Sequence, residues 1–293
     1  TDAARGANKQ LRSDVDEAES AGTDDLTAFG ADGFTVGNGG KVNASGQTYV
    51  GWSWKAGTTS VPSGGDLTPS AVSLNATSGI SIIVYTGTGA TSNTIAHGLG
   101  AVPKFMFFKN RDATMDWVTY HEAMGNTDYM ILNSTAAEAA STTRWNDTSP
   151  TSTLFTIGNT DKLNSDTVDY IGWVFADVQG YSKFGNFTGN GNADGPFVYT
   201  GFKPAFLMIK RFSSTGSWLM FDDLRLGYNV DNDRLMADDT GVESTTDYID
   251  ILSNGFKLTI SDSYVNASGG TYIYIAFAEA PFVNSSGAPV NAR

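Results

Sequence analysis

Residues 42–52 read VNASGQTYVGW, and near the other end of the chain residues 265–275 read VNASGGTYIYI. A third version, LNSDTVDYIGW, occupies residues 163–173. The aligned tyrosines Tyr170 and Tyr272 lie about 100 residues apart, which is the size of a domain and too long for a solenoid repeat. The pattern therefore predicts a chain built from a duplicated domain-sized unit. Such a chain is more often a scaffold or a binding protein than a single-site enzyme.

The front half of the unit recurs as well. The stretch ISIIVYTGTG at 80–89 matches YSKFGNFTGNG at 181–191, and PKFMFFKNR at 103–111 matches PAFLMIKR at 204–211. These matches divide the chain into units. We predict the second half of a truncated first repeat at 1–57, a linker at 58–77, complete repeats at 78–179 and 180–283, and a C-terminal tail at 284–293.

Residues 1–57 match only the second half of the unit. The letters DAAR at 2–5 align with DDLR at 222–225, and Leu11 aligns with Leu235. Half of a sandwich cannot cover its own apolar face. We expect upstream sequence to be missing, whether cleaved or simply absent, and keep strand donation by another chain as the alternative.

The composition favours short strands joined by polar turns. The chain has 293 residues, of which 40% are hydrophobic, 12% aromatic and only 17% charged, and it contains 33 glycines. The apolar segments are short and bounded by turn residues such as Asn-Gly and Asp-Gly, while helix-forming stretches are scarce. We predict an all-β fold of tandem antiparallel β-sandwich repeats, jelly-roll-like and of about 100 residues each.

Charge and cysteine content exclude several classes of function. The net charge of −13 argues against nucleic acid or an anionic membrane as a partner, because both need a basic surface. The absence of cysteine excludes disulfides, thiol nucleophiles and zinc–thiolate sites. No apolar run reaches the roughly 20 residues that span a bilayer. We expect no membrane insertion and no cofactor.

Candidate catalytic residues are few. Of the two histidines, His97 lies in a turn where we expect bonds to the backbone, and His121 follows a predicted strand and is expected at the surface. Glycoside hydrolysis needs two carboxylates that converge on one substrate. Neighbouring residues of an extended segment point to opposite faces, so adjacent acids do not form such a pair by themselves. The adjacent acids are Asp24-Asp25, Asp222-Asp223 and Asp238-Asp239.

Loop residues supply the remaining candidates for binding. Asp231 and Asp233 could offer oxygen ligands to calcium, although an ordinary turn explains them better because the glycine and glutamate of an EF-hand loop are missing. Aromatic rings in loops could stack on sugar rings, and we select Trp145 and Tyr199 for that role. The Asn-x-Ser pattern at Asn43 recurs within the repeated motif, which favours a role in a turn over glycosylation.

The stretch GYSKFGNFTGNGNADGPFVYTGFKP at 180–204 resembles a signature of virion structural proteins of tailed bacteriophages, common among aquatic phages and usually described as tail-fibre-like. YTGTGA at 85–90, HGLG at 97–100 with Pro103, and NASGGTYIY at 266–274 are similar to other marks of that family. The resemblance covers nearly the whole chain and carries no catalytic residues.

This resemblance implies a non-enzymatic component of the virion surface, on the tail or the capsid. The first hypothesis is a tail fibre or spike that attaches to bacterial surface glycans, with homo-oligomers and other virion proteins as partners. The alternative is a capsid-decorating or other assembly subunit. A third hypothesis is a glycan-degrading tailspike enzyme, which predicts loss of cleavage in Asp222→Asn or Asp238→Asn.

Overall fold

The computed structural model describes residues 1–57, 59–225, 229 and 232–279, so the predicted tail at 284–293 lies outside the described residues. The described chain is almost entirely β-structure, with every strand pair antiparallel. Its helical elements are the four-residue α1 (Gly40–Asn43) and the single 3-10 turn η1 (Glu122–Met124). The predicted all-β, antiparallel fold class is confirmed.

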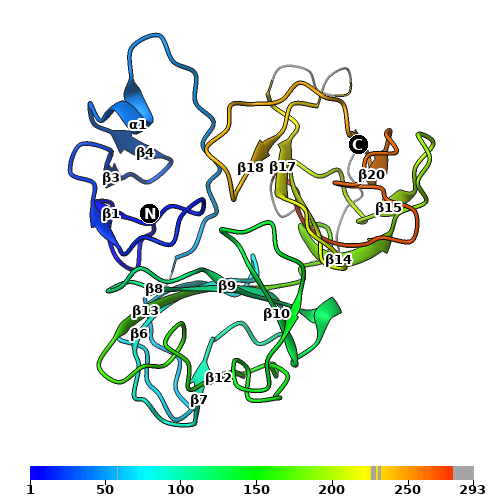
Figure 1. Cartoon of the computed structure of the whole chain (residues 1–293). Coiled ribbons are helices and arrows are strands. Elements are labelled where there is room, and N and C mark those ends of the chain that lie inside the picture. Colours follow the sequence, from blue (N-terminus) through cyan, green and yellow to red (C-terminus); the bar gives the residue numbers. More distant parts are fainter. Residues whose placement is uncertain (58, 226–228, 230–231, 280–293) are drawn as a thin grey trace, which may run out of the picture.

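The chain forms three lobes (Figure 1): a first lobe of residues 1–57, a second of residues 65–176 and a third of residues 181–279. The second lobe has a seven-stranded sheet in the order β11-β10-β9-β8-β13-β6-β5 and a facing pair β12-β7. The bounds are β5 (Ala71–Asn75), β6 (Ile80–Thr86), β7 (Ser92–Ala96), β8 (Pro103–Asn110), β9 (Val118–His121), β10 (Asp128–Ile131), β11 (Ala139–Ala140), β12 (Leu154–Gly158) and β13 (Asp169–Ala176).

The third lobe repeats this order of strands. Its five-stranded sheet runs β14-β21-β16-β17-β18, and its second sheet runs β15-β20-β19. Strand β21 lies between β14 and β16 as β13 lies between β6 and β8. The bounds are β14 (Ser182–Thr188), β15 (Phe197–Tyr199), β16 (Phe206–Arg211), β17 (Trp218–Asp222), β18 (Leu235–Met236), β19 (Ile249–Leu252), β20 (Gly255–Leu258) and β21 (Thr271–Phe277).

The first lobe is smaller and more open. It contains two short hairpins, β1 (Lys9–Gln10) with β2 (Ser20–Ala21) and β3 (Leu26–Phe29) with β4 (Phe34–Val36). After α1, residues 47–57 form no strand. The segment 58–77, predicted as a linker, contains β5, which pairs with the edge of the second lobe's large sheet. The alternating Val72 and Leu74 are buried there, and this burial explains why the segment is a strand.

Alternation along the central strands explains how each large sheet buries both faces. On β13, Tyr170 and Val174 point into the second lobe, between its two sheets. Ile171 and Phe175 point to the opposite face. That face packs on the equivalent face of the third lobe, so both sides of the sheet lie in apolar surroundings.

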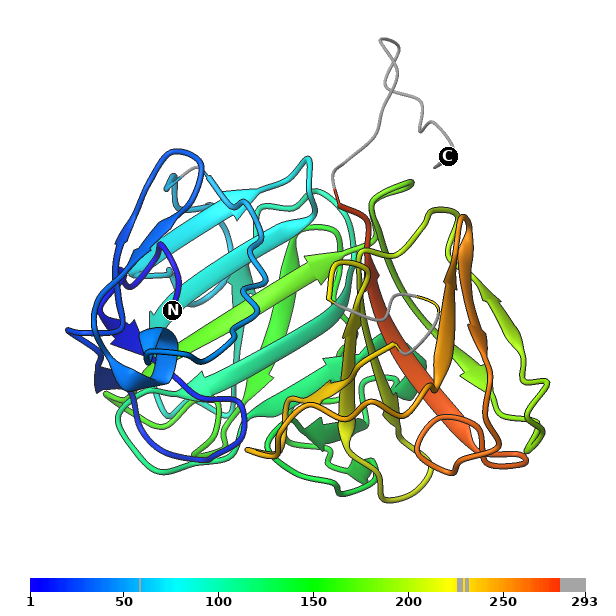
Figure 2. The same cartoon turned by 90° about the horizontal axis from the view of Figure 1, so that it is seen from above.

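The two large sheets and the first lobe contribute side chains to one shared central core. Figure 1 shows how the three lobes are arranged, and Figure 2 shows the two large sheets from above. Phe105 and Phe175 of the second lobe contact Phe184 of the third. Trp54 of the first lobe packs edge-on against Phe277 of the third. The lobes are therefore joined by aromatic packing, which is the strongest apolar contribution that the composition offers.

Neighbouring lobes also meet through corresponding hydrogen bonds. The indole Nε1–H of Trp117 in the second lobe donates to the Arg12 carbonyl of the first lobe at 2.8 Å. The indole of Trp218 in the third lobe donates to the Ile131 carbonyl of the second at 3.0 Å. A buried indole needs such an acceptor, so each tryptophan orients one lobe against the preceding one.

Two corresponding arginines each lie over a tryptophan ring of the next lobe around the molecule. The Arg5 guanidinium of the first lobe lies 5.6 Å from the ring centre of Trp173 in the second lobe. The Arg225 guanidinium of the third lobe lies 5.8 Å from the ring centre of Trp52 in the first. The third lobe thus contacts the first as the first contacts the second, and the three lobes close into a ring around the central core.

The repeated motif of the sequence is a loop closed by a tyrosine hydroxyl. In all three lobes the hydroxyl accepts from a backbone N–H five residues earlier and donates to a carbonyl nine residues earlier. The three loops are Gly40–Tyr49, Asp161–Tyr170 and Ser263–Tyr272. In the third lobe Asn266 is fully buried, and its amide donates to the Asn192 and Ile260 carbonyls. This burial agrees with the prediction of a turn role over glycosylation.

Candidate functional site

Trp145 is not available to a ligand. Its side chain is 1% exposed, and its ring packs against Phe108 and edge-on against Tyr120. The indole Nε1–H donates to the Asp128 carbonyl at 3.0 Å. The prediction that Trp145 stacks on a sugar is wrong. Removing the apolar ring from water lowers the free energy, so the ring packs inside the second lobe.

Tyr199, the other selected aromatic, is the more exposed of two rings on one strand face. Along β15 the exposed fractions are 46% for Phe197 and 63% for Tyr199, while Val198 between them is buried. Side chains two apart on a strand share a face, so the two rings form one exposed aromatic surface. Sequence reasoning missed Phe197, although the alternation of the letters FVY at 197–199 could have indicated it.

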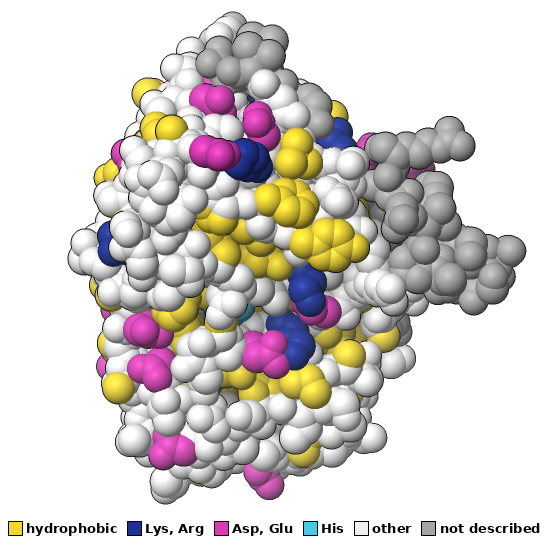
Figure 3. All heavy atoms as spheres, turned by 90° about the vertical axis from the view of Figure 1, so that its right-hand side faces the viewer, with side chains coloured by type: hydrophobic (Ala, Val, Ile, Leu, Met, Phe, Trp, Pro, Cys, Tyr) yellow, Lys and Arg dark blue, Asp and Glu magenta, His cyan; other side chains and the backbone are white. Residues whose placement is uncertain are grey.

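A polar depression of about 490 Å³ lies beside Tyr199. Its lining includes Asp177, Gln179, Lys183 and Thr200. Lys183 Nζ forms an ion pair with Asp177 Oδ2 at 2.9 Å. Figure 3 looks onto the side of the molecule where β15 lies, and hydrophobic side chains gather there next to acidic and basic ones. An exposed aromatic surface beside hydrogen-bonding groups suits a ligand with both apolar and hydroxylated faces.

Backbone bonds hold this site in place. The N–H groups of Thr200 and Gly201 both donate to the Asn254 carbonyl, at 3.0 and 3.2 Å. Gly201 has φ of +88°, a conformation that side chains rarely adopt. On the paired strand, a Cβ at Gly255 would fall 2.1 Å from the Val198 carbonyl oxygen and 3.0 Å from the Phe197 ring. Glycine is required at both positions for the aromatic strand to lie as it does.

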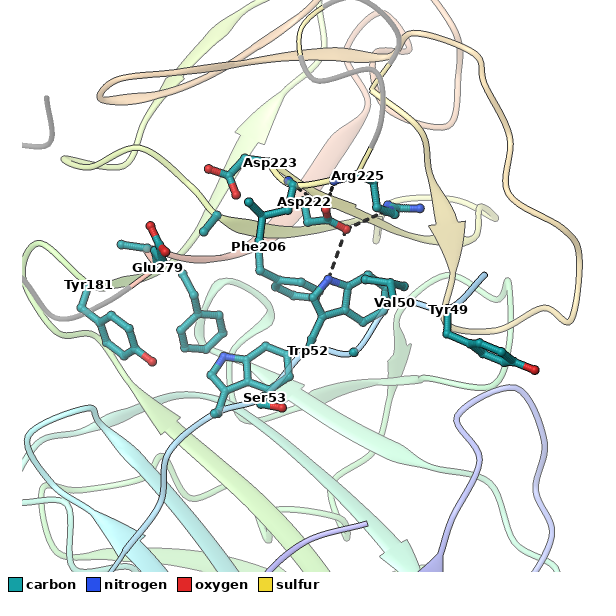
Figure 4. A pocket seen from close by; sticks show the side chains of 16 residues that line it. Tyr49, Val50, Trp52, Ser53, Tyr181, Phe206, Asp222, Asp223, Arg225 and Glu279 are labelled. Atoms are coloured by element: carbon teal, nitrogen blue, oxygen red, sulfur yellow. Dashed lines mark hydrogen bonds and ion pairs between the residues drawn. The ribbon is translucent and has the colours of Figure 1, made fainter. Parts of the chain in front are cut away.

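A second depression, of about 430 Å³, lies between the first and third lobes (Figure 4). Trp52 and Trp54 form one wall and Phe206 another. The Trp52 Nε1–H donates to Asp222 Oδ2 at 3.2 Å, and Arg225 Nε donates to the same oxygen at 2.6 Å. Asp222, Trp52 and Arg225 are thus engaged with one another, and the aromatic rings give this gap between the lobes much of its lining.

The adjacent acids do not form a catalytic pair. Asp222 is buried, and its Oδ1 accepts the N–H groups of Leu224 and Arg225. Asp238 Oδ1 accepts the N–H of Trp218 at 2.9 Å. Burial raises the pKa of Asp238. The Asp222 carboxylate therefore closes a local turn, whereas that of Asp238 fixes its loop to the start of β17.

Three further members of these pairs, Asp25, Asp223 and Asp239, have partners of their own. Asp223 forms an ion pair with Lys203 at 2.8 Å. Asp239 accepts from the Gly241 N–H, and Asp25 accepts from the side-chain amide of Gln10. Asp222 and Asp223 both line the depression of Figure 4, as does Glu279. Asp222 is bonded to Arg225 there and Asp223 to Lys203, so each of the two adjacent acids is engaged in an ion pair of its own.

The two histidines are both buried. His97 is held in its turn as predicted: Nδ1 accepts from the Leu99 N–H, so Nε2 donates to the Thr151 carbonyl at 3.2 Å. His121 was predicted at the surface, which is wrong because it is 1% exposed and packs against Phe105. Burial lowers the pKa of His121 to about 3, and its Nδ1 accepts from the Ala123 N–H. It stays neutral and caps a turn.

Two buried lysines occupy corresponding positions of β8 and β16. Burial lowers the pKa of Lys109 and of Lys210 to about 8. Each ammonium group donates to backbone carbonyls, Lys210 to those of Thr135 and Gly216 among others. Both side chains are enclosed, so no substrate can reach a lysine base here.

Of the two proposed calcium ligands, only Asp233 lies within the described residues. Asp231 lies outside the described residues, and the main-chain carbonyl of Asp233 accepts from Arg225 Nη2 at 2.7 Å. Among the residues that the structure describes, no group of three or more metal-ligating side chains occurs. Within the same residues, no helix is long and apolar enough to cross a membrane.

The fold defines an all-β protein of antiparallel sandwiches with an aromatic surface patch. The chain belongs to the family described as a domain of unknown function, DUF7483, whose model matches residues 1–281. Comparison with curated proteins and with solved structures found no match.

Proposed function

We propose that this chain is a non-enzymatic structural protein of a tailed-phage virion, acting as a tail fibre or spike that binds bacterial surface glycans through the third lobe. The exposed pair Phe197 and Tyr199 carries the proposal. Large aromatic rings are normally buried, and two on one exposed strand face mark a contact surface. Their flat faces suit the C–H faces of sugar rings, and the polar depression next to them suits sugar hydroxyls.

The sequence supports the same proposal. Both aromatic residues lie within 180–204, the stretch that resembles the tail-fibre-like virion proteins. The net charge of −13 disfavours nucleic acid as a ligand but does not hinder neutral or basic glycans. A glycan-degrading activity finds no support from Asp222 and Asp238, because each carboxylate is bonded to backbone N–H groups.

Glycan binding by purified variants tests the site. We expect the chain to bind host-surface polysaccharide, and Tyr199→Ala to weaken binding about tenfold, equivalent to 1.4 kcal/mol. Phe197→Ala should act similarly. Tyr264→Ala is the matched control, because Tyr264 is also exposed but is not on β15. Equal binding by Tyr199→Ala and Tyr264→Ala, measured by calorimetry, would exclude the β15 surface as the glycan site.

The capsid-decorating alternative is supported by a different observation, the apolar side chains that the first lobe exposes, which suit assembly. Immunogold electron microscopy of the virion separates the two locations. Gold on the tail or its fibres supports adsorption, whereas gold over the head supports decoration.

A further inference from the structure

The first lobe exposes side chains that the other lobes bury. Its open face consists of Phe29, Phe34, Val36 and Tyr49, whose exposed fractions are 45%, 46%, 37% and 49%. The corresponding residues of the third lobe are all 0% exposed: Ile251, Phe256, Leu258 and Tyr272. An apolar face of this kind on a soluble chain marks an interaction surface.

The correspondence rests on backbone geometry as well as on sequence. Phe29 pairs with Phe34 across β3 and β4, as Ile251 pairs with Phe256 across β19 and β20. The Tyr49 hydroxyl closes its loop with the bonds that the other two tyrosines make. The first lobe therefore has the second half of a sandwich already in its folded form.

In the complete lobes an aromatic residue of the front strand covers this tyrosine. Tyr85 of β6 stacks on Tyr170 with ring centres 5.3 Å apart. Phe187 of β14 stacks on Tyr272 at 5.1 Å. No ring stacks on Tyr49 within the described part of the chain.

Counterparts of β6 and β8 are missing from the described first lobe. Residues 47–57 follow the tyrosine loop as β13 and β21 do, and those strands each pair on both sides. Among the described residues 47–57 form no strand, although Trp52 and Trp54 still alternate inward. The depression of Figure 4 runs along Tyr49–Trp54, so part of this segment is left uncovered.

We propose that the open face of the first lobe docks a polypeptide segment from outside these 293 residues, made of antiparallel apolar strands with the pattern of β6 and β8. One aromatic side chain of that segment stacks on Tyr49, and its strands pair with residues 47–57. Main-chain bonds supply affinity in strand addition of this kind, and side-chain pockets supply specificity. The segment restores for the first lobe the half of the sandwich that the other lobes contain.

A fusion tests the proposal with a probe from the chain itself. Residues 78–119 contain β6 and β8. Thr1 and Asp2 of the first lobe correspond to Tyr120 and His121 of the second. A copy of 78–119 is therefore placed directly before Thr1. We expect Tm to rise by about 5 °C. Binding of the dye ANS should fall, because the open face is covered. Amides of 47–57 should become protected from hydrogen exchange.

The control is the same fusion with Tyr85→Asp and Phe108→Asp in the added copy only. It should leave the dye binding and the exchange of 47–57 as in the unfused chain. If both fusions behave alike, the proposal fails. It also fails if the unfused chain is a dimer that Phe34→Asp dissociates, because a second copy would then be the occupant.

Discussion

The first and third lobes contain the same tyrosine loop, yet Tyr49 is half exposed and Tyr272 is fully buried. Both hydroxyls make the same two backbone bonds. The local hydrogen bonds of the loop therefore do not depend on what covers the ring. Burial depends on the front strands, which the third lobe has and the described first lobe lacks.

The largest difference between the lobes should follow removal of a core ring. Phe256→Ala empties a fully buried site in the third lobe and should cost about 3–5 kcal/mol of unfolding free energy. Phe34→Ala, at the matching position of the first lobe, should cost about 1 kcal/mol or less, since the ring is half exposed already. Urea unfolding of both variants measures the contrast. Similar losses would mean that the first lobe's face is covered in solution.

A smaller effect should come from the ion cluster that joins the first two lobes. Glu19 accepts from Arg5 at 2.8 Å and from Arg111 at 2.8 and 3.0 Å. Burial opposes its ionisation, but these hydrogen bonds outweigh burial and lower the pKa of Glu19 to about 2. Glu19→Gln should cost about 2 kcal/mol at pH 7.

The pH dependence gives that prediction a sign. The folded pKa of Glu19 lies below its ordinary value of 4.5, so its contribution is complete above that pH and is lost as the pH falls towards 2. Glu138 is the matching residue of the second lobe: its backbone N–H donates to the Phe212 carbonyl of the third lobe, as that of Glu19 donates to the Arg111 carbonyl of the second. Burial and the nearby charge of Asp128 raise the pKa of Glu138. Glu138→Gln is therefore the control, and it should not reduce the loss of unfolding free energy that occurs as the pH falls. A Glu19→Gln variant with an unchanged pH profile would show that the cluster does not link the lobes.

The smallest effect concerns the hydroxyl of the repeated loop. Tyr272→Phe leaves the Ala267 N–H and the Ser263 carbonyl without their partner inside the protein and should cost about 1–2 kcal/mol. Tyr49→Phe should cost about 0.5 kcal/mol, because water can replace the hydroxyl at an exposed site. Equal losses, measured by thermal unfolding, would contradict the difference in burial between the lobes.

Sequence patterns predicted the strands and the repeated loops better than they predicted the site. Turn residues such as Asn-Gly and Asp-Gly bound the short apolar segments and indicated where strands end. Trp145 and His121 were misplaced because a single aromatic or histidine in a loop carries no periodic signal. Their burial comes from residues distant in the sequence, such as Phe108 for Trp145 and Phe105 for His121.

The sequence by itself determined the all-β class, the matching halves of the repeated unit and the tyrosine loop, because these depend on period-two alternation and on bonds between residues within ten positions of one another. Only the tertiary structure decided that the two large sheets pack face to face around a shared aromatic core, that Phe197 and Tyr199 remain outside it, and that the first lobe presents an open apolar face. The physical reason is that burial is a property of surfaces brought together by the whole chain, and no local pattern specifies which surface meets which.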